Sequence, residues 1–146
     1  MSKIKEYLQN IREIVTDNQK IWYDYLLEHG ESFNVRKDYE KNNLPFVREK
    51  QCFNNSFLLT TVIDYDFYYY EGFYLCDGLP FPIEHAFNKK SNEDFIIDIT
   101  AQKFDIKVNE WFGIKIPNCV LKDWFHGDQH LTPLQYYFRF KIKYKK

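Results

Sequence analysis

Residues 67–75 read FYYYEGFYL, a dense aromatic run whose length and composition are typical of a buried β-strand. Gly72 lies inside this run, and a glycine within a strand indicates a bulge or the close approach of another backbone. The sequence CDG at residues 76–78, followed by Pro80 and Pro82, predicts a turn. The chain is therefore expected to reverse after its most aromatic strand.

Further strands are expected downstream of this turn. Residues 83–88 and 95–99 are predicted to continue an antiparallel meander that starts with 67–75. Residues 111–116 predict another strand. Aromatic and basic residues alternate over 138–145, which predicts a last strand with one basic face. Together with the helices expected upstream, these strands predict the α+β class.

The part of the chain upstream of the aromatic run is expected to be helical and then irregular. Apolar residues recur in steps of three, four and seven over residues 1–30, the spacing of an amphipathic helix. Ser2 is suited to begin this helix, Gly30 to end it, and residues 17–18 to divide it into two. Residues 31–50 are polar and predict a long surface loop.

The composition predicts a single globular domain over residues 1–146, because 45% of the residues are hydrophobic and 28% are charged. The net charge of −1 gives no overall attraction to nucleic acid or to anionic membranes. Residues 1–20 mix charged with apolar residues, and no apolar run reaches about 18 residues. We therefore expect a cytoplasmic protein without a signal peptide or a membrane partner.

The cysteines and histidines do not predict a metal site. Cys52, Cys76 and Cys119 lack the Cys-x-x-Cys spacing of zinc and redox sites, so reduced thiols are expected, the last two with a structural role. His126 and His130 are four residues apart, but the glycine and proline near them argue against a stable helix. We expect neither a metal nor another cofactor.

Three residues form a candidate catalytic triad. A thiol attacks as its thiolate, which a helix N-terminus or a neighbouring imidazolium stabilises. Cys52 stands where a loop meets a predicted short helix, and the unpaired N–H groups there can also hold an oxyanion. His85 is the expected general base, and Asp98, on the next predicted strand, would orient its imidazole.

Each of these residues also has a simpler interpretation. A lone cysteine is most often a small core residue, a strand histidine can be held by ordinary hydrogen bonds, and an aspartate commonly forms a turn. Gln51 and Asn55 are candidate donors to a substrate or an oxyanion, although capping or packing is the simpler role for each. Glu71 is either a buried carboxylate that braces the site or an ordinary charge on a strand face.

Five short motifs resemble those of a family of small phage and bacterial proteins, which are similar to papain-like and transglutaminase-like thiol enzymes. KQCFNNS at residues 50–56 resembles that family's Lys-Gln-Cys-Tyr-x-Asn-Ala motif. YEGF at 70–73 and EHAF at 84–87 resemble its Val-Glu-Gly-Tyr and His-Ala-Trp elements. IDIT at 97–100 and WFGI at 111–114 resemble its Val-Asp-Pro-Thr and Tyr-Phe-Gly-Val elements.

The resemblance covers residues 45–117, with the motifs in the same order and with similar gaps. It implies a papain-like or transglutaminase-like α+β core in which Cys52 is the nucleophile, His85 the base and Asp98 the orienting residue. The nucleophile helix would pack on an antiparallel sheet. Residues 1–30, as an extra N-terminal helical segment, and 118–146, as an extension with a basic strand, lie outside it.

Two residues inside the matched region depart from the family pattern. Ile99 replaces the family's proline and Phe87 its tryptophan. Neither change touches the triad, although both alter the end of a strand and the surroundings of the site. The resemblance indicates a class of chemistry and no particular substrate.

The expected function is acyl transfer by a thiol. Cys52 would attack a peptide or a glutamine-type amide of a protein or peptide substrate and pass the acyl group to water, as a protease or deamidase does, or to an amine, as a transglutaminase does. The sequence does not show whether water or an amine is the acceptor, and it leaves the oligomeric state open.

Two alternatives belong to other classes. One is a catalytically silent phage or mobile-element protein that binds and inhibits a host protein through an aromatic surface. The 14 Phe, 12 Tyr and 3 Trp suit such a surface, and they equally suit the codon usage of a low-GC genome. The weaker alternative is nucleic-acid binding through Arg139, Lys141, Lys143 and Lys145, whose simpler role is to protect an edge strand.

Overall fold

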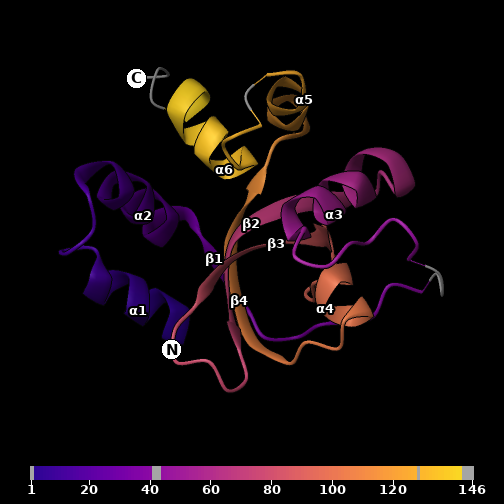
Figure 1. The fold of residues 1–146 in the computed structure, drawn as a ribbon, viewed down its shortest axis with the longest axis horizontal. Helices are drawn as coiled ribbons and strands as arrows, with labels where there is room; N and C mark the ends of the chain where they lie inside the picture. Colours follow the sequence, from indigo (N-terminus) through magenta and orange to yellow (C-terminus); the bar gives the residue numbers. More distant parts are fainter. Residues whose placement is uncertain (1, 41–43, 128, 143–146) are drawn as a thin grey trace.

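A computed structural model describes residues 2–40, 44–127 and 129–142, with the backbone alone described at the last two positions. The fold is α+β, as expected, with one four-stranded antiparallel sheet at its centre. In Figure 1, α1 and α2 lie to the left of the strands, α3 and α4 to the right, and α5 and α6 above them.

The sheet is built around the aromatic run. β2 (Phe67–Cys76) pairs with β3 (Ile83–Lys90) on one side and with β4 (Val108–Ile116) on the other, and β1 (Glu31–Phe33) adds to β4. The strand order is therefore β1-β4-β2-β3. The strands predicted at 67–75, 83–88 and 111–116 are confirmed.

The strand predicted over residues 95–99 is wrong, and so is the three-stranded meander. Ile96 and Ile97 each form only an isolated bridge, to Arg36 and Asn88. α4 (Ile99–Lys103) begins directly afterwards. The aspartate just before Ile99 caps this helix, and that local interaction ends the extended backbone. β3 is therefore an edge strand, and β4 joins the sheet on the other side of β2, with which it pairs along nearly its whole length.

The N-terminal region forms two helices, as predicted. α1 (Lys3–Ile11) is capped by the hydroxyl of Ser2, and α2 (Asp17–His29) ends at Gly30. The break lies just before Asp17, because a capping box at Thr16 starts the second helix.

The segment 31–50 is more ordered than a surface loop. Besides β1, it contributes the buried side chains of Tyr39, Leu44 and Val47 to a small apolar cluster with Leu59 and Ile99. The prediction of a surface loop is therefore wrong for these residues, whose apolar side chains hold the segment against the rest of the molecule.

The C-terminal strand predicted over 138–145 is also wrong. α5 (Asn118–His126) is followed by α6 (Pro133–Tyr136) and a π-helical turn, η2 (Tyr137–Ile142), and residues 143–146 lie outside the described residues. A capping box at Thr132 starts this last helix, and the rings of Tyr136 and Phe140 meet one turn apart at 4.8 Å. The helix started at Thr132 therefore continues through the segment whose alternating aromatic and basic residues predicted a strand.

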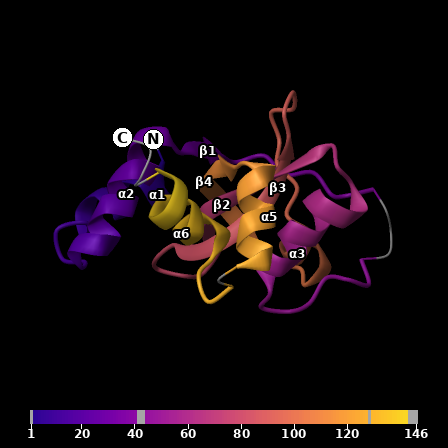
Figure 2. The same ribbon diagram turned by 90° about the horizontal axis from the view of Figure 1, so that it is seen from above.

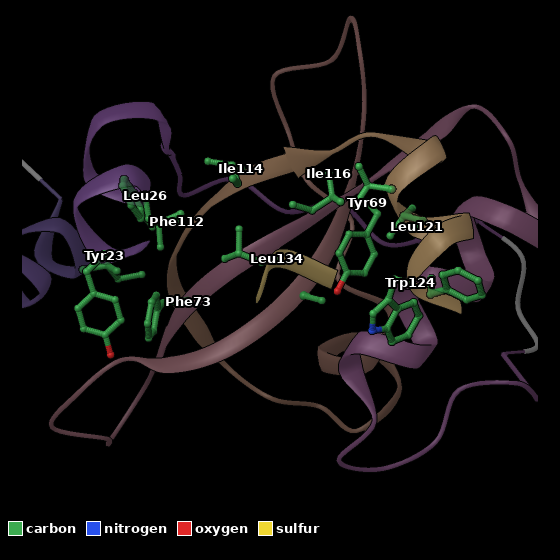
Figure 3. Close-up of a cluster of buried hydrophobic side chains, with 14 of the residues drawn as sticks. Tyr23, Leu26, Tyr69, Phe73, Phe112, Ile114, Ile116, Leu121, Trp124 and Leu134 are labelled. Carbon is green, nitrogen blue, oxygen red and sulfur yellow. The ribbon is translucent and has the colours of Figure 1, made fainter. Parts of the chain in front are cut away.

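The two faces of the sheet are covered differently. Tyr69, Phe73, Phe112 and Ile114 point to one face, called here the helix face, where apolar residues of α1, α2, α3, α5 and α6 pack on them (Figure 3). Figure 2 shows α5 and α6 lying across the strands. No helix among the described residues combines the length and apolar character needed to cross a membrane.

The opposite face, called here the His85 face, holds a smaller cluster. Its apolar members include Tyr70, Phe87, Ile96 and Trp111. Gly72 lies at its centre, between the partner strands, and a Cβ atom there would collide with the carbonyl oxygen of residue 112. The close backbone approach predicted for Gly72 is confirmed.

Candidate active site

His85 lies in the middle of β3, opposite Gly72 of β2. Because side chains alternate along a strand, it points to the His85 face, away from the large apolar core. Its side chain is buried, with only 1% of the residue exposed. The ring of Tyr74 is stacked on the imidazole, with 3.7 Å between ring centroids and 7° between planes. The imidazole is thus held in one plane.

Asp98 is the N-cap of α4 and is also 1% exposed. One carboxylate oxygen, Oδ1, accepts the backbone N–H of Ala101 at 3.1 Å. The other, Oδ2, lies 2.7 Å from Nε2 of His85 and accepts the indole N–H of Trp111 at 2.8 Å. The capping interaction therefore fixes the carboxylate in the position from which it contacts the imidazole.

The nitrogen roles of His85 follow from these contacts. The carboxylate of Asp98 has no proton to donate, so Nε2 must carry the hydrogen of the 2.7 Å bond. Nδ1 is then the nitrogen that does not face Asp98, and Cys52 is close enough to the imidazole to help raise the pKa of His85. The structure thus brings together all three residues of the predicted triad.

Charge pairing outweighs burial at this pair. Burial opposes protonation of the ring, but the charge and hydrogen bond of Asp98, together with Cys52, raise the pKa of His85 above its ordinary value. Burial also opposes ionisation of Asp98, yet His85, Trp111 and the N–H of Ala101 hold the pKa of that carboxyl below its ordinary value. The arrangement therefore favours the imidazolium that forms when His85 accepts a proton beside the ionised Asp98.

Cys52 is the first residue of α3 (Cys52–Leu58), which continues into the π-helical turn η1 (Leu59–Ile63). The predicted short helix is therefore confirmed. The Cys52 residue is half-buried, whereas His85 and Asp98 are fully enclosed. Of the three, only the sulfur-bearing residue is open to an approaching molecule.

The two amide side chains proposed as oxyanion donors have different positions. Gln51 is exposed at the N-cap of α3, and its side chain makes no capping hydrogen bond. Asn55 is fully buried, and both N–H groups of its amide are used: one donates to the carbonyl oxygen of Arg48 at 2.8 Å and one to Oγ1 of Thr100 at 2.9 Å. Asn55 therefore has no N–H left for an oxyanion.

Glu71 points away from the triad. It neighbours Gly72 on β2 and so projects to the helix face, whereas His85 projects to the other. Its Oε1 accepts the hydroxyl of Tyr69 at 2.7 Å and the backbone N–H of Leu134 at 3.0 Å. Burial raises the pKa of Glu71 to about 7. The carboxylate braces α6 against β2 and contacts no part of the triad face.

Of the remaining cysteines, Cys76 adjoins the site, because it is close enough to Tyr74 and Asp98 to interact with both. The three cysteines form no disulfide, Cys76 is buried, and Cys119 is exposed on α5, which contradicts a structural role for that thiol. α5 ends at His126, so His130 does not share its helix face. Among the described residues, no group of three potential metal ligands comes together.

Three residues of the site were missed as functional residues in the sequence. Trp111 and Thr100 lie inside two of the quoted motifs, but nothing in those motifs indicates a contact with Asp98 or Asn55. Tyr74 was recognised only as part of an aromatic strand. Its position two residues from Gly72 is the one available signal, because a period of two places it on the same face as His85.

Comparisons of the chain with protein-family models, with curated proteins and with solved structures find no match. The chemistry of the site therefore has to be argued from its own geometry.

Proposed function

We propose that this protein is a thiol-dependent acyl-transfer enzyme in which Cys52 is the nucleophile, His85 the general base and Asp98 the orienting carboxylate. The observation that carries the proposal is the buried 2.7 Å contact between Nε2 of His85 and Asp98, with Cys52 close enough to the imidazole to help raise the pKa of His85. This is the order of contacts that a thiol–imidazole–carboxylate triad requires.

The reaction runs in two steps. Nδ1 of His85 accepts the proton of the Cys52 thiol, the sulfur bonds to the acyl carbon, and the bond from that carbon to the leaving group breaks as His85 returns the proton. Water or an amine then attacks the thioester while His85 takes its proton, and the carbon–sulfur bond breaks to free the thiol. The raised pKa of His85 suits the first transfer.

The start of α3 supplies further support. The first N–H groups of a helix have no acceptor within the helix, so those at Cys52 and the next residues are suited to bind the oxyanion formed at the attacked carbon. Gln51 remains the side-chain candidate for this role, because it is exposed beside the sulfur-bearing residue.

We infer the papain-like or transglutaminase-like arrangement on the same basis. The nucleophile begins a helix that packs against β3, the base lies on that strand, and the five motifs occur in the order of the resembling family. The substrate class that follows is a peptide or protein amide, with water or an amine as acceptor.

The test uses p-nitrophenyl acetate, a generic acyl donor. Wild-type protein is expected to acetylate at Cys52, with release of p-nitrophenolate, and to regain the free thiol by hydrolysis. Because a general base contributes about 10²–10⁴-fold, His85→Ala should slow acetylation by at least about 100-fold. Intact-protein and peptide mass spectrometry locates the acetyl group, and absorbance follows turnover.

Cys119→Ser is the matched control, because Cys119 is an exposed thiol on α5 and lies outside the triad. If Cys52 acetylates no faster than Cys119 in wild-type protein, the proposal is wrong. The alternative is then a binding protein, in which the exposed aromatic side chains of Tyr65 and Phe81 would contact the partner.

A further inference from the structure

Resting on the proposed function, we infer that Asn55 and Thr100 are positioning residues that hold Cys52 in line with the His85–Asp98 pair. The two residues connect the helix that carries the nucleophile to the helix that carries the orienting carboxylate. Their hydrogen bonds go to each other and to the backbone of Arg48, so they act through the backbone that bears Cys52.

The first part of the connection is the Asn55 amide. Its Oδ1 accepts the backbone N–H of Arg48 at 2.9 Å, and its Nδ2 donates to the carbonyl oxygen of the same residue at 2.8 Å. This paired contact closes a loop between α3 and the segment that leads into it. Lys50, inside that loop, has a φ of 60°, a left-handed backbone that a lysine adopts only when its surroundings hold it. The amide therefore stabilises the turn that delivers Cys52.

The second part is α4. The second N–H of the Asn55 amide donates to Oγ1 of Thr100, 2.9 Å away, and both residues are buried. Thr100 stands two residues after Asp98, which caps the same helix and contacts His85. A displacement of α4 relative to α3 would therefore change the distance between the thiol and the imidazole.

The same short helix holds the rest of the segment before Cys52. The ammonium of Lys103 donates to the carbonyl oxygens of Leu44 at 2.8 Å and Val47 at 3.0 Å. The side-chain amide of Gln102 exchanges two hydrogen bonds with the backbone of Tyr39. The N-cap of α4 thus supplies the orienting carboxylate, and residues of the helix hold the segment that leads to the nucleophile.

The test replaces Thr100 by valine, which keeps the shape of the side chain and removes the hydroxyl. Thr60→Val is the matched control. Oγ1 of Thr60 also accepts a buried asparagine amide, that of Asn88, at 2.8 Å, but that contact does not involve the segment leading to Cys52. Both variants lose the same kind of hydrogen bond at similar burial.

The readout is the rate at which iodoacetamide alkylates Cys52, expressed as the ratio of the rate at pH 6 to the rate at pH 9. Mass spectrometry monitors the reaction at a temperature below the melting temperature of each variant. A small misplacement of a reacting group costs about tenfold to 100-fold. Thr100→Val should lower the relative rate at pH 6 by at least about tenfold, Thr60→Val should leave it unchanged, and Thr100→Ser should restore it.

Equal behaviour of Thr100→Val and Thr60→Val would overturn the inference, whether both change or neither does. The result is separable from the proposed function, which is read from acetyl transfer. If acetyl transfer fails in wild type while alkylation at pH 6 depends on both His85 and Thr100, the positioning role stands without the enzyme. If acetyl transfer succeeds and Thr100→Val has no effect, the triad stands without this positioning role.

Discussion

Among the described residues, two carboxylates are buried, one on each face of the sheet, and their surroundings differ in kind. Glu71, on the helix face, accepts hydrogen bonds from the neutral donors Tyr69 and Leu134. Asp98, on the His85 face, is paired with an imidazole as well as with neutral donors. Burial raises the pKa of Glu71 to about 7, whereas His85 and its neighbours keep the pKa of Asp98 low.

The difference shows how burial acts on a carboxyl group. Desolvation opposes ionisation of both groups, and hydrogen bonds from neutral donors only partly offset it at Glu71. A titratable partner changes the balance at Asp98, because the imidazolium and the carboxylate stabilise each other's charge. The helix face therefore holds a structural brace, and the His85 face holds a pair of groups that stabilise each other's charge.

The largest expected effect comes from removing the negative charge of Asp98. Asp98→Asn should slow acetylation of Cys52 by about 10³–10⁴-fold, because the imidazolium loses its counterion and its fixed tautomer. It should also cost about 3–5 kcal/mol of stability, since a charge partner of a buried pair is removed. Stopped-flow absorbance and urea unfolding measure the two quantities.

Glu71→Gln is the matched substitution on the other face. Its amide oxygen can still accept from Tyr69 and Leu134, so the acetylation rate should stay at the wild-type value. A loss of rate as large as that of Asp98→Asn would show that the two faces are not functionally distinct.

The pH dependence of stability sharpens the comparison. The pKa of Glu71 is about 7 when folded and near its ordinary value of 4.5 when unfolded, so between these values the folded state keeps a proton that the unfolded state has lost. The free energy of unfolding should therefore fall as pH rises through this window, by about 3 kcal/mol. Glu71→Gln should not show this fall.

Urea unfolding of both proteins at pH 5 and pH 8 measures this difference. The His85–Asp98 pair is common to wild type and Glu71→Gln and so cancels in the subtraction. Parallel stability curves for the two proteins would mean that Glu71 titrates in the folded state as it does in the unfolded chain.

The smallest effect concerns two indole N–H groups. Trp111 donates to the charged Asp98 on the His85 face, and Trp124 donates to the neutral carbonyl oxygen of Leu131 at 2.7 Å on the helix face. Trp111→Phe should cost about 2 kcal/mol, because bonds to charged groups are the stronger kind, and Trp124→Phe about 1 kcal/mol. Only Trp111→Phe should also slow acetylation, by about tenfold.

These two variants are compared in the same unfolding and acetylation assays. An equal acetylation rate for Trp111→Phe and Trp124→Phe would indicate that the indole of Trp111 packs against Asp98 without orienting it.

The main strands and the three residues of the site could be predicted from local pattern. The aromatic run of β2, the helix that begins at Cys52 and the place of His85 on a strand follow from local residue patterns, whereas Asp98, expected on a strand, caps α4 instead. The role of Asn55 could not be predicted. Its amide donates to the carbonyl oxygen of Arg48, which is near in sequence, and to the hydroxyl of Thr100, which is far away in sequence. A donor predicted for substrate proved to be a connection within the fold.

The sequence by itself determined which segments are helical or extended wherever one residue pattern dominates, since capping residues and hydrophobic periodicity act over a few neighbours. Tertiary structure alone decided that β4 lies beside β2, that the carboxylate of Asp98 meets His85 and Trp111, and that Glu71 points away from His85. These outcomes depend on contacts between residues distant in sequence, whose energies no local pattern contains.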